Sequence, residues 1–149
     1  MQAIIGIILK IINSIRASFA KPVDGMSIGN IRLMEKIYSK GWDLPVGMLD
    51  AKYYYTDRAG WAEIISDIVF NSPLFQKDKF DCDNFAFRAM SLCAERHGIN
   101  ACGVAIGASP FGRHAWNVIY DGEGFVFFEP QTGEFLEIDG EYHADDIII

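Results

Sequence analysis

A β-hairpin in the C-terminal third is the sequence feature that most restricts the fold of this chain. Residues 113–120 read Arg-His-Ala-Trp-Asn-Val-Ile-Tyr and residues 125–130 read Phe-Val-Phe-Phe-Glu-Pro, with the turn residues Asp-Gly-Glu-Gly between them. Two β-branched and aromatic runs on either side of such a turn predict an antiparallel pair. Pairing of Tyr120 with Phe125 across the turn would fix the register, and a slip of one residue would reverse every side chain.

This register brings a histidine and a glutamate to one face of the hairpin. Trp116 would lie opposite Glu129 and His114 opposite Gln131, so that His114 and Glu129 become diagonal neighbours. Diagonal neighbours lie roughly 7–8 Å apart, a separation that long side chains span. We therefore expect Glu129 to bond one imidazole nitrogen of His114 and to leave the other nitrogen facing a thiol.

A cysteine stands at the start of a helix predicted for the segment from residue 82 to Gly98. Asp81 is a suitable N-cap, and Cys82 would lie in the first turn, where unpaired N–H groups and the helix dipole favour a thiolate. The alternative is that this cysteine is a small core residue, which is common for free cysteines. Apolar residues follow it at the spacing of a core-facing helix, namely Phe85, Ala86, Ala89 and Cys93.

Three segments resemble the transglutaminase-like and papain-like cysteine peptidase superfamily. Asp-Cys-Asp-Asn-Phe-Ala (81–86) is similar to the nucleophile segment of bacterial transglutaminase-like cysteine proteinases, and His-Ala-Trp-Asn-Val (114–118) to the histidine strand of the superfamily. Phe-Phe-Glu-Pro-Gln-Thr-Gly (127–133) resembles the third-residue segment of the papain-like domain of fungal agglutinins. The resemblance covers roughly residues 79–136.

This resemblance implies a cysteine hydrolase that cleaves peptide or amide bonds of a polypeptide substrate through a thioester intermediate. Cys82 would be the nucleophile, His114 the general base and Glu129 the residue that orients the imidazole. Two alternatives stay open: acyl transfer on the same triad, as in a transglutaminase or deamidase, and a non-catalytic module that retains the fold. The chemistry requires no cofactor.

Further residues are candidates for an oxyanion hole or a substrate site. The backbone N–H of Cys82 is one oxyanion donor, and Gln76 and Trp42 are candidates for a side-chain partner. Trp116 is expected to pack on the sheet, and in this superfamily the aromatic residue of the histidine strand can also line the active site. Gln131, on the same hairpin, is a further substrate-site candidate.

The acids around the cysteine suggest a calcium site. Asp81 and Asp83 disfavour a thiolate between them, and a bound cation would offset their charge. Ca²⁺ takes carboxylate and amide oxygens, which Asp81, Asp83 and Asn84 supply. The alternative is that these side chains cap the helix and lie in its first turn at the surface, since their spacing is not that of an EF-hand.

Residues 1–20 predict an amphipathic helix preceding a single domain over residues 21–149. Lys10 interrupts the apolar run, so the uncharged stretch is too short to span a bilayer. Packing on the domain or a partner is the favoured interpretation, a secretory signal ending near Ala20 the second, and membrane-surface contact the least favoured. Reduced thiols favour a cytoplasmic protein, and a secreted one follows if the segment is a signal.

The remaining pattern predicts an α+β protein with the helices first. Helices are expected near residues 27–41, 61–70 and 82–97, followed by strands near 101–107, 113–120 and 125–130. We expect a papain/transglutaminase-like arrangement, with the helix of Cys82 packed on an antiparallel sheet. The net charge of −7 and pI of about 4.8 make nucleic acid an unsuitable partner.

Overall fold

The computed structural model describes residues 4–8, 11, 25–42, 45–70, 72–137 and 140–149. Of the N-terminal segment 1–20, residues 4–8 and 11 are described and are helical, while the rest of that prediction lies outside the described residues. Within the described part of the chain, no helix has the length and apolar character needed to cross a bilayer.

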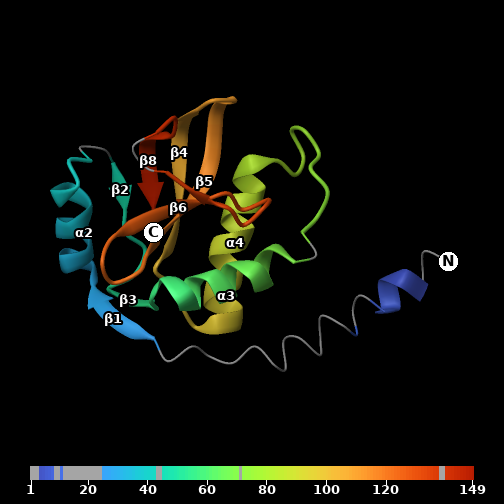
Figure 1. The fold of residues 1–149 in the computed structure, drawn as a ribbon, viewed down its shortest axis with the longest axis horizontal. Helices are drawn as coiled ribbons and strands as arrows, with labels where there is room; N and C mark the ends of the chain where they lie inside the picture. The colour runs from blue at the N-terminus through green and yellow to red at the C-terminus, as the bar shows by residue number, and fades with distance from the viewer. Residues whose placement is uncertain (1–3, 9–10, 12–24, 43–44, 71, 138–139) are drawn as a thin grey trace.

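Three helices and eight strands follow one another in the described part of the chain from residue 26 onward (Figure 1). The helices are α2 (Asn30–Ser39), α3 (Arg58–Val69) and α4 (Cys82–His97). The strands are β1 (Met26–Gly29), β2 (Val46–Gly47), β3 (Lys52–Tyr55), β4 (Cys102–Ser109), β5 (Gly112–Tyr120), β6 (Phe125–Phe128), β7 (Phe135–Leu136) and β8 (His143–Ile148).

Six strands form the main sheet, in the order β2-β8-β4-β5-β6-β7, and β1 pairs with β3 in a separate antiparallel ribbon. The predicted arrangement of helices followed by an antiparallel sheet is wrong in two respects. Strands β1, β2 and β3 precede α4, and β2 runs parallel to β8. The reason is that β2 is two residues long and takes its partner from the far end of the chain, so no local pattern marks it.

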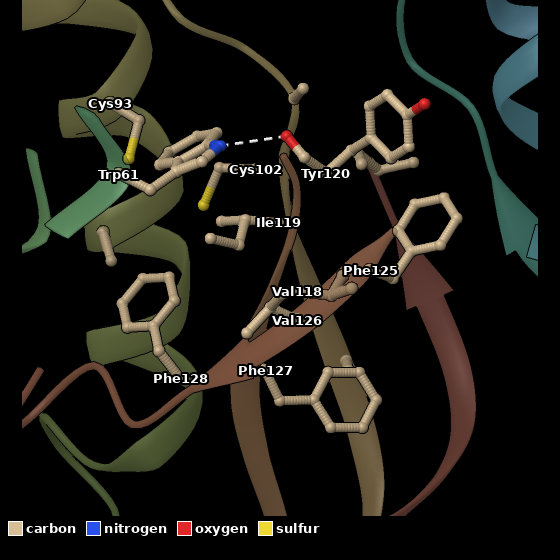
Figure 2. Packing of buried hydrophobic residues seen from close by; sticks show 14 of the residues in the cluster. Trp61, Cys93, Cys102, Val118, Ile119, Tyr120, Phe125, Val126, Phe127 and Phe128 are labelled. Carbon is tan, nitrogen blue, oxygen red and sulfur yellow. Dashed lines mark hydrogen bonds between the residues drawn. The ribbon is translucent and has the colours of Figure 1, made fainter. Parts of the chain in front are cut away.

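The register expected for the hairpin is confirmed. Tyr120 pairs with Phe125 and Asn117 with Phe128 across β5 and β6. Every residue of β6 is buried, and Figure 2 shows Phe128 on the side of the strand that faces Trp61 of α3. The indole N–H of Trp61 donates to the carbonyl of Tyr120 at 2.9 Å, which fixes α3 against the end of β5.

Helix α4 packs on β4 and β5 and is joined to both by one buried amide. Asn117 is fully buried, and its Nδ2 donates at 2.9 Å both to the carbonyl of Ala86 on α4 and to that of Gly103 on β4. Because the donor satisfies two backbone carbonyls in the core, the first turns of α4 are held at a fixed position over the sheet.

The last strand is inserted between β2 and β4, and a tyrosine fastens its end. The hydroxyl of Tyr53 donates to the carbonyl of Ile149 at 2.7 Å and accepts the N–H groups of Leu49 and Asp50 at 3.0 Å. A Cβ at Gly107 of β4 would collide with the backbone carbonyl of His143, so a glycine is needed there for β8 to approach.

Candidate functional site

A pocket of about 700 Å³ lies where the start of α4 faces the ends of β5 and β6. It is open to solvent on one side and combines charged, amide and aromatic side chains, a mixture typical of ligand sites. The lining residues are Phe75, Lys77, Asp78, Asp81, Cys82, Phe111, Arg113, His114, Glu129, Gln131, Thr132, Glu134, Leu136 and Tyr142.

A tight turn positions the start of α4 at the pocket. The N–H of Gln76 donates to the carbonyl of Phe80 and the N–H of Phe80 donates back, both at 2.8 Å. Asp78 takes the left-handed conformation with φ 59°, and its N–H donates to the carboxylate of Asp81 at 2.9 Å. Cys82 follows as the first residue of α4, half-buried against Ala86 and its neighbours, as the helix prediction expected.

A histidine and a glutamate form a hydrogen-bonded pair on the opposite wall. His114 Nε2 lies 2.8 Å from Glu129 Oε2, and the two side chains are 13% and 14% exposed. The structure therefore brings together the two residues that the hairpin register made diagonal neighbours. The bond to Nε2 leaves Nδ1 as the second ring nitrogen, and the expectation that this nitrogen faces the thiol stays a prediction.

The glutamate is itself held by the turn that follows β6. Its Oε1 accepts the backbone N–H of Gln131 at 3.2 Å and the Gln131 side-chain amide at 3.4 Å. The N–H of Gly133 donates to the carbonyl of Glu129 at 2.7 Å, and Gly133 has φ 79°, a conformation that favours glycine. The segment 129–133 thus supports the carboxylate from the side opposite the histidine.

Aromatic rings back the histidine. The ring of His114 is stacked on Trp116 with centroids 6.2 Å apart, and Tyr142 lies 6.5 Å from it. Burial and the nearby carboxylates of Glu129, Glu141 and Glu134 raise the pKa of Tyr142, so its hydroxyl remains a neutral donor and acceptor in the pocket.

Two carboxyl groups at the start of α4 shift each other's pKa. Asp83 donates to Asp81, and this hydrogen bond lowers the pKa of Asp81 and raises that of Asp83. The carboxyl oxygens of Asp81 and Asp83 and the sulfur of Cys82 lie within 4.8 Å of one another. Asn84, the third predicted metal ligand, accepts the backbone N–H of Asp81 through its Oδ1 at 3.1 Å, which occupies the oxygen that a cation would use.

Of the other predicted site residues, the structure places one in the lining of the pocket and three outside it. Gln131 lines the pocket, whereas Gln76 belongs to the turn before α4 and is not part of the lining. Trp116 is fully buried behind His114. Trp42 does not line the pocket and packs instead on Phe125 and Phe127, with centroids 5.7 and 5.5 Å away, so the structure does not support it as an oxyanion partner.

Sequence reasoning missed several of the lining residues. Phe75 precedes the turn before α4, and Phe111 lies at the tip of the β4–β5 turn with 86% of its surface exposed. Arg113, also in the lining, is paired with Asp145 at 2.9 Å on the surface. A large aromatic residue in the sequence Pro-Phe-Gly was the available signal for Phe111, since a turn exposes its central residues.

The thiol, imidazole and carboxylate thus line one pocket, from the start of α4, from β5 and from the turn that follows β6. An imidazole held by a carboxylate can accept the proton of a nearby thiol and so make it nucleophilic. The pocket also offers hydrogen-bond acceptors at Glu129 and Glu134 and aromatic faces at Phe75 and Phe111, which suit a ligand with both hydroxyl groups and apolar faces.

The family of the chain follows from a comparison with known domains. The family model described as the ricin-type beta-trefoil lectin C-terminal domain matches residues 28–149. The chain belongs to this family. No curated protein matches the sequence.

Two solved structures share the fold. A PSL1a–E64 complex has a TM-score of 0.69 and 23% identity, and covers 83% of this chain and 51% of that chain. The Polyporus squamosus lectin bound to the human-type influenza-binding epitope Neu5Aca2-6Galb1-4GlcNAc has a TM-score of 0.68 and 21% identity, and covers 83% of this chain and 49% of that chain. The chain therefore spans about half the length of these structures.

These findings correct the family and the function expected from the motifs. The matching family is described as a lectin domain and one structure is a lectin bound to a glycan, and neither description names a peptidase. The assignment to the transglutaminase-like or papain-like peptidases, the papain/transglutaminase-like fold label and the role as a cysteine hydrolase are replaced accordingly. The acyl-transfer alternative, the non-catalytic module with a peptidase fold and the polypeptide substrate are replaced with them.

Proposed function

We propose that this chain belongs to a carbohydrate-binding protein and that the pocket between α4, β5 and β6 receives the saccharide. The observation that carries the proposal is the hydrogen-bonded pair of His114 and Glu129 at 2.8 Å beside exposed phenylalanine rings. Sugar hydroxyls need fixed donors and acceptors, and the apolar faces of sugar rings stack on aromatic side chains. The family of lectin domains supports the same function.

The charges of the pocket favour a neutral saccharide over an acidic one. Four carboxyl groups line it, those of Asp78, Asp81, Glu129 and Glu134. Of the two cations in the lining, Lys77 and Arg113, the second is already paired with Asp145. A further carboxylate beside these acids would be repelled by about 1 kcal/mol or more, which is roughly fivefold in affinity.

A titration with two related glycans tests this function. We expect Galb1-4GlcNAc to bind more tightly than Neu5Aca2-6Galb1-4GlcNAc by roughly fivefold, measured by calorimetry or by NMR shifts of pocket residues. Glu129→Gln should abolish the binding, because the amide can no longer accept at both oxygens. Glu95→Gln, on the exposed side of α4, is the matched control. Absence of binding by either glycan at millimolar concentration would refute the proposal.

We further propose that the same pocket binds E64, the compound present in the PSL1a complex. The half-buried thiol of Cys82, which lines the same pocket as His114, supports this second ligand. Mass spectrometry and thermal shift of the wild type and of Cys82→Ser test it. A shift that is equal in both proteins would place E64 elsewhere.

A further inference from the structure

We infer that the N-terminal segment is a membrane-surface anchor that attaches the chain to anionic lipid. The described turn of this segment, residues 4–8 with residue 11, is helical, and its isoleucines are between 49% and 63% exposed. Figure 1 shows the turn standing apart from the sheet and its helices. The described isoleucines are therefore not part of the buried core, and the expectation that the segment packs on the domain or on a partner stays a prediction.

The sequence spacing gives the segment one broad apolar face. Ile4, Ile8, Ile11 and Ile15 recur at intervals of three and four residues, while Lys10 falls on the opposite side of a helix. A helix with an apolar face, a basic residue opposite and no acid lies along a bilayer surface rather than across it. The apolar side chains would enter the region between headgroups and acyl chains.

Charge favours a lipid surface over pairing of this face with the same segment of a second copy. Three of the thirteen basic residues, Lys10, Arg16 and Lys21, lie in residues 1–21, together with none of the twenty acids. The remaining chain holds ten basic and twenty acidic residues. A second copy would offer the same basic face, and an anionic bilayer would attract the segment while repelling the acidic body. The body would thus be held away from the surface with its pocket open to solvent.

Vesicle sedimentation with the full chain tests this anchor. We expect the protein to co-sediment with vesicles of equimolar phosphatidylcholine and phosphatidylglycerol, and much less with phosphatidylcholine alone. Ile4→Asp should lower the partition coefficient roughly tenfold or more, since a charged group would enter the apolar layer. Lys10→Glu should lower it on the anionic vesicles by a similar factor and have little effect on the neutral ones.

Leu49→Asp is the matched control for Ile4→Asp. Leu49 is 62% exposed and Ile4 is 63% exposed, so both substitutions place a carboxylate on an exposed apolar residue without disturbing the core. Equal loss of sedimentation in the two variants would overturn the inference, as would sedimentation that is the same with both kinds of vesicle. An oligomer in size-exclusion chromatography that Ile4→Asp dissociates would assign the face to a second copy and overturn it as well.

Discussion

The two ends of helix α4 carry similar residues in different settings. At its start, Cys82 is half-buried and faces a pocket where His114 is bonded to Glu129 at 2.8 Å. At its end, Cys93 is fully buried and His97 is bonded to Asp67 of α3 at 3.0 Å. The same residue types therefore line a ligand site at one end and join two helices at the other, and access to solvent decides which.

The carboxylate at the buried end joins two helices, whereas the pocket carboxylate is held within its own hairpin and turn. Asp67 accepts from Arg96 through Oδ1 at 3.0 Å and bonds His97 through Oδ2, so one carboxylate joins two side chains of α4 to α3. The pocket carboxylate of Glu129 bonds one ring and the turn that follows its own strand. A change at the buried end should therefore act on stability, and a change at the pocket end on ligand binding.

Thiol reactivity should show the largest difference between the two ends. Iodoacetamide should label Cys82 in the folded protein, while Cys93 and Cys102 are fully buried and burial raises the pKa of the Cys102 thiol well above its usual value. If labelling of the buried thiols needs an opening that costs about 4 kcal/mol, their rates fall roughly a thousandfold. Mass spectrometry of the time course measures this difference. Labelling of all three cysteines at one rate would contradict the comparison.

Asp67→Asn should destabilise the fold by about 2–3 kcal/mol. The substitution removes the charge shared by Arg96 and His97, whose side chains are 16% and 8% exposed and have little water to replace it. Urea unfolding measures the change. Asp145→Asn is the control, since its pair with Arg113 lies at the surface and should contribute less than about 0.5 kcal/mol. Equal effects would show that burial does not distinguish the pairs.

Glu129→Gln should change stability by about 1 kcal/mol or less. The glutamine side chain keeps the size of the original and one acceptor oxygen, while His114 gains access to water through the pocket. The effect of this substitution on glycan binding should exceed its effect on the urea midpoint, whereas Asp67→Asn should show the reverse order. If the ratio of the effect on glycan binding to the effect on the urea midpoint were similar in the two variants, the functional distinction between the two ends of α4 would be removed.

Asp83→Ala should have the smallest effect on stability, because Asp83 is an exposed residue. It removes the hydrogen bond that lowers the pKa of Asp81, so this pKa should rise toward its ordinary value in a carboxyl ¹³C titration. In the wild type, Asp81 contributes stability that is lost as the pH falls through its folded pKa. Asp83, with a raised pKa, contributes stability that is lost as the pH rises through its folded pKa, so the two largely cancel.

Calcium offers a check on the same two carboxyl groups. We propose that a Ca²⁺ ion at Asp81 and Asp83 would favour the ionised form of both carboxyl groups, and the same titration in millimolar calcium should then show Asp83 losing its proton at lower pH. An unchanged titration would leave these residues as capping groups of α4.

The sequence predicts the parts of the site that depend on local geometry. The turn at residues 121–124 fixes the β5–β6 register, and the helical spacing after Cys82 matches the buried residues of α4. Gly98 ends the helix in the left-handed conformation with φ 67°, as its position predicts. The chemical role of Cys82, His114 and Glu129 stays a prediction.

Partners that are distant along the chain were not predictable. His97, at the end of α4, bonds Asp67 of another helix, and no local pattern marks this partner. Trp42 was expected near the site, and its partly buried ring packs against the core, on the rings of Phe125 and Phe127. The motifs within residues 79–136 led to the wrong family. The match that corrects it extends over residues 28–149 and so includes flanking residues that carry no recognisable local motif.

The hydroxyl of Tyr53 has a consequence for the synthesis of the protein. It bonds the carbonyl of Ile149, which is 96 residues away in the sequence, and β2 likewise finds its partner in β8. During translation the segment 46–55 must therefore wait for almost a hundred further residues before its final neighbours exist. Contacts of such long sequence separation form late and slow folding, so the tyrosines of β3 are exposed to chaperones and to other nascent chains until β8 leaves the ribosome.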